Sequence, residues 1–180
     1  MSLYLIRHGE TEDNLIRRIQ GQSQTPLNEL GVQQAHAIRL RIQDLNFDRV
    51  YCSKILRAIQ TAQIIENVKP IIYDSRLNER SYGIWENQLW DDVFQSTPDL
   101  KLAMTDLKFR PPNGESIKDV IDRTINVLRE ILDFELNNKK VLIVGHGGPI
   151  KVISGYINGM AEIDYYKQKV FKNCELSQIK

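Results

Sequence analysis

Two of the three histidines in this chain follow a short apolar run, with one residue between, and stand next to a glycine. His8 follows the run at residues 3–6 and precedes a glycine, and His146, after the run at 141–144, lies between glycines. A neutral imidazole is a competent nucleophile near pH 7, because its ordinary pKa is about 6.5. No two histidines fall at metal-ligand spacing, and His8 comes with an arginine rather than with cysteine or carboxylate ligands. The pattern favours anion chemistry over a metal site, although either histidine alone is more often structural.

Other residue types needed for chemistry on a phosphate group are also present. Attack on a phosphate monoester builds charge on three equatorial oxygens, and planar guanidinium groups can hold two of them at once. Arg7, beside the first histidine, and Arg57, in the first turn of a predicted helix, are the candidates. A proton donor for the leaving oxygen is also required, and on chemistry alone Glu10, Glu79 or Glu86 would serve. His36, on the polar border of a predicted helix, is interpreted as a surface residue.

Strands that alternate with helices must position these residues. Apolar runs predict strands at 3–6, 49–52, 70–73, 141–144 and about 174–179, and helical spacing predicts helices at about 28–45, 53–65 and 116–132 and from Pro149. Asn28 and Ser53 are predicted helix caps, and Ser116 with Asp119 resembles a capping box. The alternation predicts a three-layer α/β/α sandwich with a mostly parallel central sheet. Residues that follow parallel strands then meet at one sheet edge.

The length of 180 residues predicts one domain, residues 1–180. A long irregular region at 74–114 is interrupted by Pro98, Pro111, Pro112 and Gly114. It also contains the aromatic residues Trp85, Trp90, Phe94 and Phe109. Within this region we predict a small lid at about 84–114, with those aromatic side chains as its apolar anchors.

The overall charge excludes some function classes. Lys and Arg number 24 against 23 Asp and Glu, so bulk electrostatics give no case for nucleic acid or an anionic membrane as a partner. Two cysteines are too few for a disulfide framework, which suits a reducing compartment. No apolar run approaches the roughly 20 residues that span a bilayer, and no leader segment is evident. We therefore expect a cytoplasmic protein.

Four separated motifs give the chain a specific resemblance. They are Arg7-His8-Gly9-Glu10-Thr11 with Asn14 and Gly21, Ser53 to Ala58 with Thr61, Leu77-Asn78-Glu79-Arg80 with Gly83 to Glu86, and Gly145-His146-Gly147-Gly148. In this order, and over residues 4 to about 152, they resemble the histidine phosphatase superfamily, the phosphoglycerate mutase-like enzymes.

The resemblance implies a role for each matching residue. It implies a phosphohistidine intermediate at His8 and phosphate binding by Arg7, Asn14, Arg57 and His146. Motif position favours Glu79 over the other two glutamates as the group that protonates the leaving oxygen and then deprotonates water. Further substrate-binding candidates are Gln20, Gly21, Arg80, Tyr82 and Gly147. We expect no cofactor and no metal.

The family contains both phosphatases and cofactor-dependent mutases. The segment 87–110 is short and lacks the adjacent arginines that hold the carboxylate in such mutases, and Gly148 stands where they have asparagine. The stretch 111–116 resembles a Pro-Pro-Gly-Gly-Glu-Ser motif of small broad-specificity and α-ribazole-type phosphatases, with Asn113 replacing the first glycine. We therefore expect a metal-independent, histidine acid-type phosphatase that acts on phosphorylated small metabolites. A phosphoglycerate mutase, a non-catalytic phospho-ligand binding module and a homodimer stay open as alternatives.

Overall fold

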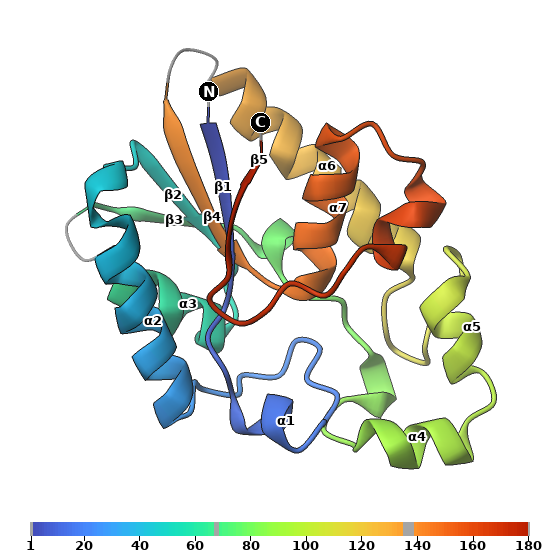
Figure 1. The fold of residues 1–180 in the computed structure, drawn as a ribbon. Coiled ribbons are helices and arrows are strands. Elements are labelled where there is room, and N and C mark those ends of the chain that lie inside the picture. The colour runs from blue at the N-terminus through green and yellow to red at the C-terminus, as the bar shows by residue number, and fades with distance from the viewer. Residues whose placement is uncertain (1, 67–68, 135–138, 180) are drawn as a thin grey trace.

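The computed structural model describes residues 2–66, 69–134 and 139–179, and within them the chain forms a five-stranded sheet (Figure 1). The strands are β1 (Ser2–Arg7), β2 (Arg49–Cys52), β3 (Ile71–Tyr73), β4 (Lys140–Gly145) and β5 (Leu176–Ile179). Their order is β3-β2-β4-β1-β5, and only β5 is antiparallel to its neighbour. The central strands are buried along almost their whole length, as continuous apolar runs require of strands covered on both faces. The predicted fold class is confirmed.

Two pairs of helices cover the two faces of the sheet (Figure 1). Helices α2 (Glu29–Ile42) and α3 (Leu56–Ile65) pack on one face, and α6 (Ile117–Phe134) and α7 (Gly147–Ile157) pack on the other. Each helix buries an apolar stripe with helical spacing, which removes apolar surface from water and so stabilises the fold. Among the described residues, no helix combines the length and the apolar character that crossing a membrane would need.

Helix caps explain where two of these helices begin. The Asn28 side chain accepts a hydrogen bond from Gly31 N at 2.8 Å, as predicted. Ser116 and Asp119 form the predicted capping box, with bonds of 3.1 and 2.7 Å between side chain and backbone. The prediction that Ser53 caps α3 is wrong. Helix α3 begins at Leu56 without a side-chain cap, because the Ser53 hydroxyl is engaged by groups at the strand ends.

The predicted lid segment is more regular than its sequence indicated. It contains the short helices α4 (Trp90–Ser96) and α5 (Leu100–Thr105) and overlaps the 3₁₀ turn η3 (Gly83–Trp85). Trp85 is buried and stacks with Phe109, but Phe94 is 65% exposed, so its prediction as an apolar anchor is wrong. Residues 12–15 form the short helix α1 (Glu12–Leu15). The single-domain boundary and the closing of residues 84–114 as a lid stay predictions.

Candidate active site

The register of the central strands brings the two motif histidines together. Arg7 on β1 lies opposite Gly145 on β4, so His8 and His146, the next residues, leave the sheet side by side. Their ring centroids are 5.2 Å apart. Ser53 leaves the adjacent strand β2 at the same edge, where its N–H donates to Val144 O at 3.1 Å.

A cavity of about 120 Å³ lies at this edge. Its lining residues are Arg7, His8, Asn14, Arg18, Gln20, Gly21, Arg57, Glu79, Tyr82 and Trp90. All of these except Arg18 and Trp90 were predicted site residues. His146 is not among the lining residues, but its ring packs against that of His8, which is. Gly147 lies beside the Glu79 carboxyl group. The fold thus gathers residues that are far apart in sequence around one small space, and their individual roles stay predictions.

Hydrogen bonds fix the protonation pattern of His8. Its Nδ1 lies 2.7 Å from Gly9 O, and because a carbonyl oxygen only accepts, Nδ1 carries the hydrogen. Its Nε2 accepts a hydrogen bond from Arg57 Nε at 3.2 Å, so this nitrogen has its lone pair available. Burial and the nearby Arg57 and Arg7 cations hold the pKa of His8 well below its ordinary value. The ring is therefore neutral near pH 7, with its hydrogen on Nδ1 and its lone pair on Nε2.

Two arginines, Arg57 buried and Arg7 partly buried, line the cavity together with His8. Arg57 is 1% exposed and is held by Ser23 O at 2.9 Å and by Gly21 O at 2.8 Å. Burial lowers its pKa to about 10, and the Glu79 carboxylate opposes that shift. Arg7 donates from Nη1 to Phe171 O at 2.8 Å, and burial lowers its pKa too. Both side chains are fixed before any substrate arrives, which suits preorganised anion binding.

Two buried polar atoms near His8 have no partner among the described residues. They are Arg7 Nε and His146 Nδ1. Buried polar atoms in native proteins are normally hydrogen-bonded, so two such atoms without a partner at one site point to a polar ligand. An anion bound next to His8 is a ligand of the right charge for the arginine. Among the described residues, no group of three or more His, Cys, Asp or Glu side chains is placed to hold a metal ion.

Glu79 faces this cavity as a fixed carboxylate. Its Oε1 accepts from Arg80 N at 2.9 Å, and its Oε2 accepts from Gly148 N at 3.3 Å. A Cβ atom on Gly148 would lie 2.9 Å from Tyr166 Oη and closer still to Glu79 Oε1, so a side chain here would require those two groups to shift. Glycine at this position therefore lets the backbone of α7 approach the carboxylate.

The two other candidate glutamates are placed differently. Glu86 Oε1 accepts from Gln22 N at 3.2 Å, from Tyr82 N at 2.9 Å and from Ser81 Oγ at 3.1 Å. It therefore fastens two loops together. Glu10 accepts from Asn28 Nδ2 at the start of α2, at 3.0 Å. Neither residue lines the cavity.

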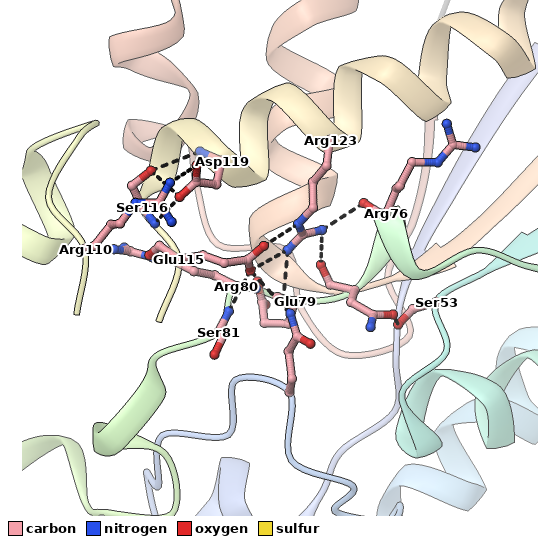
Figure 2. A network of polar contacts seen from close by, with 12 residues as sticks. Ser53, Arg76, Glu79, Arg80, Ser81, Arg110, Glu115, Ser116, Asp119 and Arg123 are labelled. Carbon is pink, nitrogen blue, oxygen red and sulfur yellow. Dashed lines mark hydrogen bonds and ion pairs between the residues drawn. The ribbon is translucent and has the colours of Figure 1, made fainter. Parts of the chain in front are cut away.

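A polar network that sequence reasoning missed holds the loop of Glu79 (Figure 2). Arg123 on α6 donates to Arg76 O at 2.8 Å, to Asn78 O at 2.7 Å and to Glu79 O at 3.0 Å. Its guanidinium also pairs with Glu115, at 2.8 Å. No local sequence pattern indicates this contact, because Arg123 lies on the polar side of its helix and the carbonyl groups it binds are more than forty positions away. The missed cavity residues Arg18 and Trp90 likewise stand in no quoted motif.

The smaller predicted contacts surround the cavity mouth. Asn14 Oδ1 accepts from Thr11 N and from Asn173 Nδ2, both at 3.3 Å, and Gln20 Oε1 accepts from Thr11 Oγ1 at 3.1 Å. Both side-chain amides are thus oriented through their oxygens, which leaves their N–H groups as donors. Gly21 has φ +51°, a backbone conformation that favours glycine.

Arg80 takes a different position from the other predicted residues. It is 1% exposed, does not line the cavity, and donates to Glu115 O, Ala103 O and Phe109 O. Two of these carbonyls belong to the 84–114 segment. Its contact with substrate stays a prediction, and the observed bonds favour a role in anchoring this segment to the Glu79 loop.

Replacing Arg80 with methionine should therefore destabilise the protein. The change leaves three carbonyl oxygens without their charged donor, and we expect the free energy of unfolding to fall by about 2–4 kcal/mol. The matched control is Arg110→Met, which removes an exposed arginine paired with Asp119 and should cost at most about 1 kcal/mol. Urea unfolding of both variants measures the difference. Equal losses would contradict the anchoring role.

The buried histidines should make stability depend on pH. The folded state holds the pKa of His8 well below its ordinary value, and in the unfolded chain the ring titrates near about 6.5. As pH falls below about 6.5, the unfolded state therefore binds more protons than the folded state, and the free energy of unfolding decreases. Above about pH 6.5 this loss is absent. His146 acts in the same direction. We expect His8→Asn to lose less stability than the wild type between pH 7.5 and 5.5, measured by urea unfolding in phosphate-free buffer. A parallel pH dependence of the two proteins would contradict this.

Comparisons with known proteins agree on one family. A model described as "Histidine phosphatase superfamily (branch 1)" matches residues 3–180. A protein of Erwinia tasmaniensis named "Probable phosphoglycerate mutase GpmB" is 33% identical over 186 residues, which cover 99% of this chain and 84% of the relative.

Solved structures show the same fold. A mycobacterial glucosyl-3-phosphoglycerate phosphatase in complex with VO3 superposes with a TM-score of 0.90 and 28% identity, covering 99% of this chain and 92% of the other. A putative alpha-ribazole-5'-P phosphatase from Escherichia coli gives a TM-score of 0.89 at 28% identity, covering 100% of this chain and 90% of the other.

Proposed function

Since this chain belongs to the histidine phosphatase superfamily, branch 1, we propose that it is a metal-independent phosphatase that hydrolyses phosphate monoesters of small metabolites. The observation that carries the proposal is the arrangement at His8. Its Nε2 lone pair faces a small cavity between the Arg7 and Arg57 side chains, and the Glu79 carboxyl group lines the same space. A nucleophile, a phosphate cradle and a proton carrier thus occur in one place.

In the first step His8 Nε2 attacks phosphorus. The N–P bond forms while the bond to the ester oxygen breaks, and Glu79, in its protonated form, gives its proton to that oxygen as the alcohol leaves. Arg7 and Arg57 stabilise the charge that develops on the transferring phosphoryl oxygens. The hydrogen bond from His8 Nδ1 to Gly9 O stabilises the positive ring that results.

In the second step water replaces the alcohol. Glu79, now a carboxylate, takes a proton from the water as its oxygen attacks phosphorus, and the N–P bond breaks to return neutral His8. The products are inorganic phosphate and a protonated Glu79. Each group ends as it began, so no metal ion or bound cofactor is needed for the balance of the reaction.

A larger hollow of about 520 Å³ adjoins the phosphate cavity and would take the rest of the ester. It shares Arg7, Asn14, Arg18 and Trp90 with the small cavity and adds Asp13, Arg17, Met104 and Val170. A wall with both charged and apolar side chains suits a metabolite with an apolar part and a polar end.

A phosphoglycerate mutase is the second candidate, because the curated relative reported above bears that name. Two features of this chain favour hydrolysis instead. The 84–114 segment holds no adjacent pair of arginines, and glycine stands at position 148, where the mutases have asparagine.

A parallel assay separates the two candidates. The protein is incubated with EDTA and with sugar phosphates, phosphoglycerates, nucleotides and 4-nitrophenyl phosphate, and both inorganic phosphate and phosphoglycerate isomers are measured. The proposal expects phosphate release from at least one ester, unaffected by the chelator. Isomer formation without phosphate release would favour the mutase, and loss of activity with EDTA would contradict metal independence.

A further inference from the structure

His146 has one ring nitrogen held by the protein and one that no described group contacts. Its Nε2 lies 2.7 Å from Ser53 Oγ, whereas Nδ1 is buried without a hydrogen-bond partner among the described residues. Both residues are 0% exposed. In native proteins a buried polar atom without a partner points to a ligand. At Nδ1 that ligand is the phosphoryl group proposed above.

The Ser53 hydroxyl connects His146 to Asn78. Ser53 Oγ donates to Asn78 Oδ1 at 2.9 Å and accepts from Ile55 N at 3.2 Å. The N–H of Lys54 donates to the same Oδ1 at 2.9 Å, which fixes the orientation of the Asn78 amide. A hydroxyl has one proton, so it donates either to Asn78 or to His146.

The direction in which the Ser53 hydroxyl donates determines which nitrogen of His146 carries hydrogen. When the hydroxyl donates to Asn78, the ring must donate from Nε2 to Oγ, and Nδ1 has a lone pair. When the hydroxyl donates to Nε2, the ring hydrogen lies on Nδ1. Asn78 Oδ1 still accepts from Lys54 N in this second arrangement, so no buried acceptor loses its only partner.

Only the second arrangement suits a bound phosphoryl group. A lone pair on Nδ1 would repel a phosphate oxygen, whereas an N–H donates to it. Burial and the nearby Arg57 hold the pKa of His146 well below its usual value, so a neutral ring carries hydrogen on one nitrogen at a time. The two arrangements contain the same protons: an N–H bond breaks at Nε2 and one forms at Nδ1, with water in the pocket taking and returning the proton.

We propose that Ser53 is a positioning residue that holds neutral His146 with its hydrogen on Nδ1 when a phosphoryl group is bound. Asn78 is the competing acceptor that draws the hydroxyl away when no phosphoryl group is present. Both residues act through His146 and not on the substrate. This inference rests on the proposed function, because it takes the phosphoryl group as the occupant of the cavity.

Nitrogen NMR of the wild-type protein tests the inference directly. With ¹⁵N-labelled histidine, the ring signals of His146 are recorded with and without inorganic phosphate at pH 7.5. The chain has only three histidines, so His36→Gln and His146→Gln suffice to assign them. We expect hydrogen on Nε2 without phosphate and on Nδ1 with phosphate. Hydrogen that stays on Nε2, or that occupies both nitrogens in the phosphate complex, overturns the proposal.

Two substitutions should act in opposite directions. Ser53→Ala leaves Nε2 unpaired in the bound state and should weaken inhibition by inorganic phosphate about 10- to 100-fold. Asn78→Ala removes the competing acceptor, so His146 should carry hydrogen on Nδ1 even without phosphate, and phosphate should bind at least as tightly as in the wild type. A merely structural contact would make both variants bind more weakly.

The matched control is Ser154→Ala, which removes a buried hydroxyl on α7 that contacts Asn158 and should leave phosphate inhibition unchanged. Wild-type affinity in Ser53→Ala, or equal weakening in both site variants, overturns the proposal. If Ser53→Ala does not fold, the wild-type spectra alone decide. A wild-type protein that shows the nitrogen change with phosphate but hydrolyses no ester supports this inference and contradicts the proposed function.

Discussion

His8→Asn should abolish turnover. Asparagine keeps a polar side chain of similar size but has no nucleophilic nitrogen, and we expect kcat/KM for 4-nitrophenyl phosphate to fall by about 10⁴-fold or more. Phosphate release measures this loss. Brief incubation of the wild type with labelled ester, followed by denaturing quench, should also trap a base-stable, acid-labile phosphoryl group on His8, and the variant should trap none.

The third histidine supplies the control for this experiment. His36 is exposed on α2, away from the cavity, and His36→Asn should retain wild-type kinetics and labelling. A phosphoryl group found on a serine or cysteine, or full activity in His8→Asn, would show that the nucleophile has been assigned wrongly.

The Glu79→Gln variant should separate substrates by leaving group. An amide has no proton to give at neutral pH, so an alkyl phosphate, whose alcohol leaves poorly, should lose about 10²- to 10⁴-fold in kcat/KM. An ester such as 4-nitrophenyl phosphate needs little protonation and should retain much more of its activity. We would measure kcat/KM for a series of phenyl and alkyl phosphates. The values for Glu79→Gln should depend more steeply on the pKa of the leaving alcohol than those of the wild type do.

Glu86→Gln is the matched control, because it makes the same change at the neighbouring glutamate. Glu86 fastens the Gln22 and Tyr82 backbones, so its replacement should lower thermal stability and affect all substrates alike. Equal losses for good and poor leaving groups in Glu79→Gln would mean that Glu79 is not the proton donor. A leaving-group effect in Glu86→Gln instead would transfer that role to Glu86.

The sequence predicted best those features that depend on short-range regularities. The apolar runs around residues 3–6 and 141–144 predicted buried strands, and the structure has them at the centre of the sheet. The helical stripe after Ser116 and its capping box were found where expected. Because parallel strands end at one edge, the residues after them could also be predicted to converge, as His8 and His146 do.

Side-chain direction was much harder to predict. Arg57 and Arg80 each stand in a quoted motif, yet Arg57 lines the cavity while Arg80 is buried against carbonyls of Ala103 and Phe109. The sequence pattern predicts Ser53 as a helix cap, but in the structure its hydroxyl is hydrogen-bonded to His146. In each case the deciding partner lies more than twenty positions away, which no local pattern records.

The sequence alone therefore determined the fold class, the family resemblance and most of the residues that meet at the sheet edge, because periodicity and strand ends can be recognised from neighbouring positions. Only the tertiary structure decided that His8 Nε2 carries the lone pair between Arg57 and the cavity, and that Arg123 and Glu115 hold the Glu79 loop. Hydrogen-bond direction depends on which groups long-range packing brings within 3 Å, and packing is a property of the whole chain.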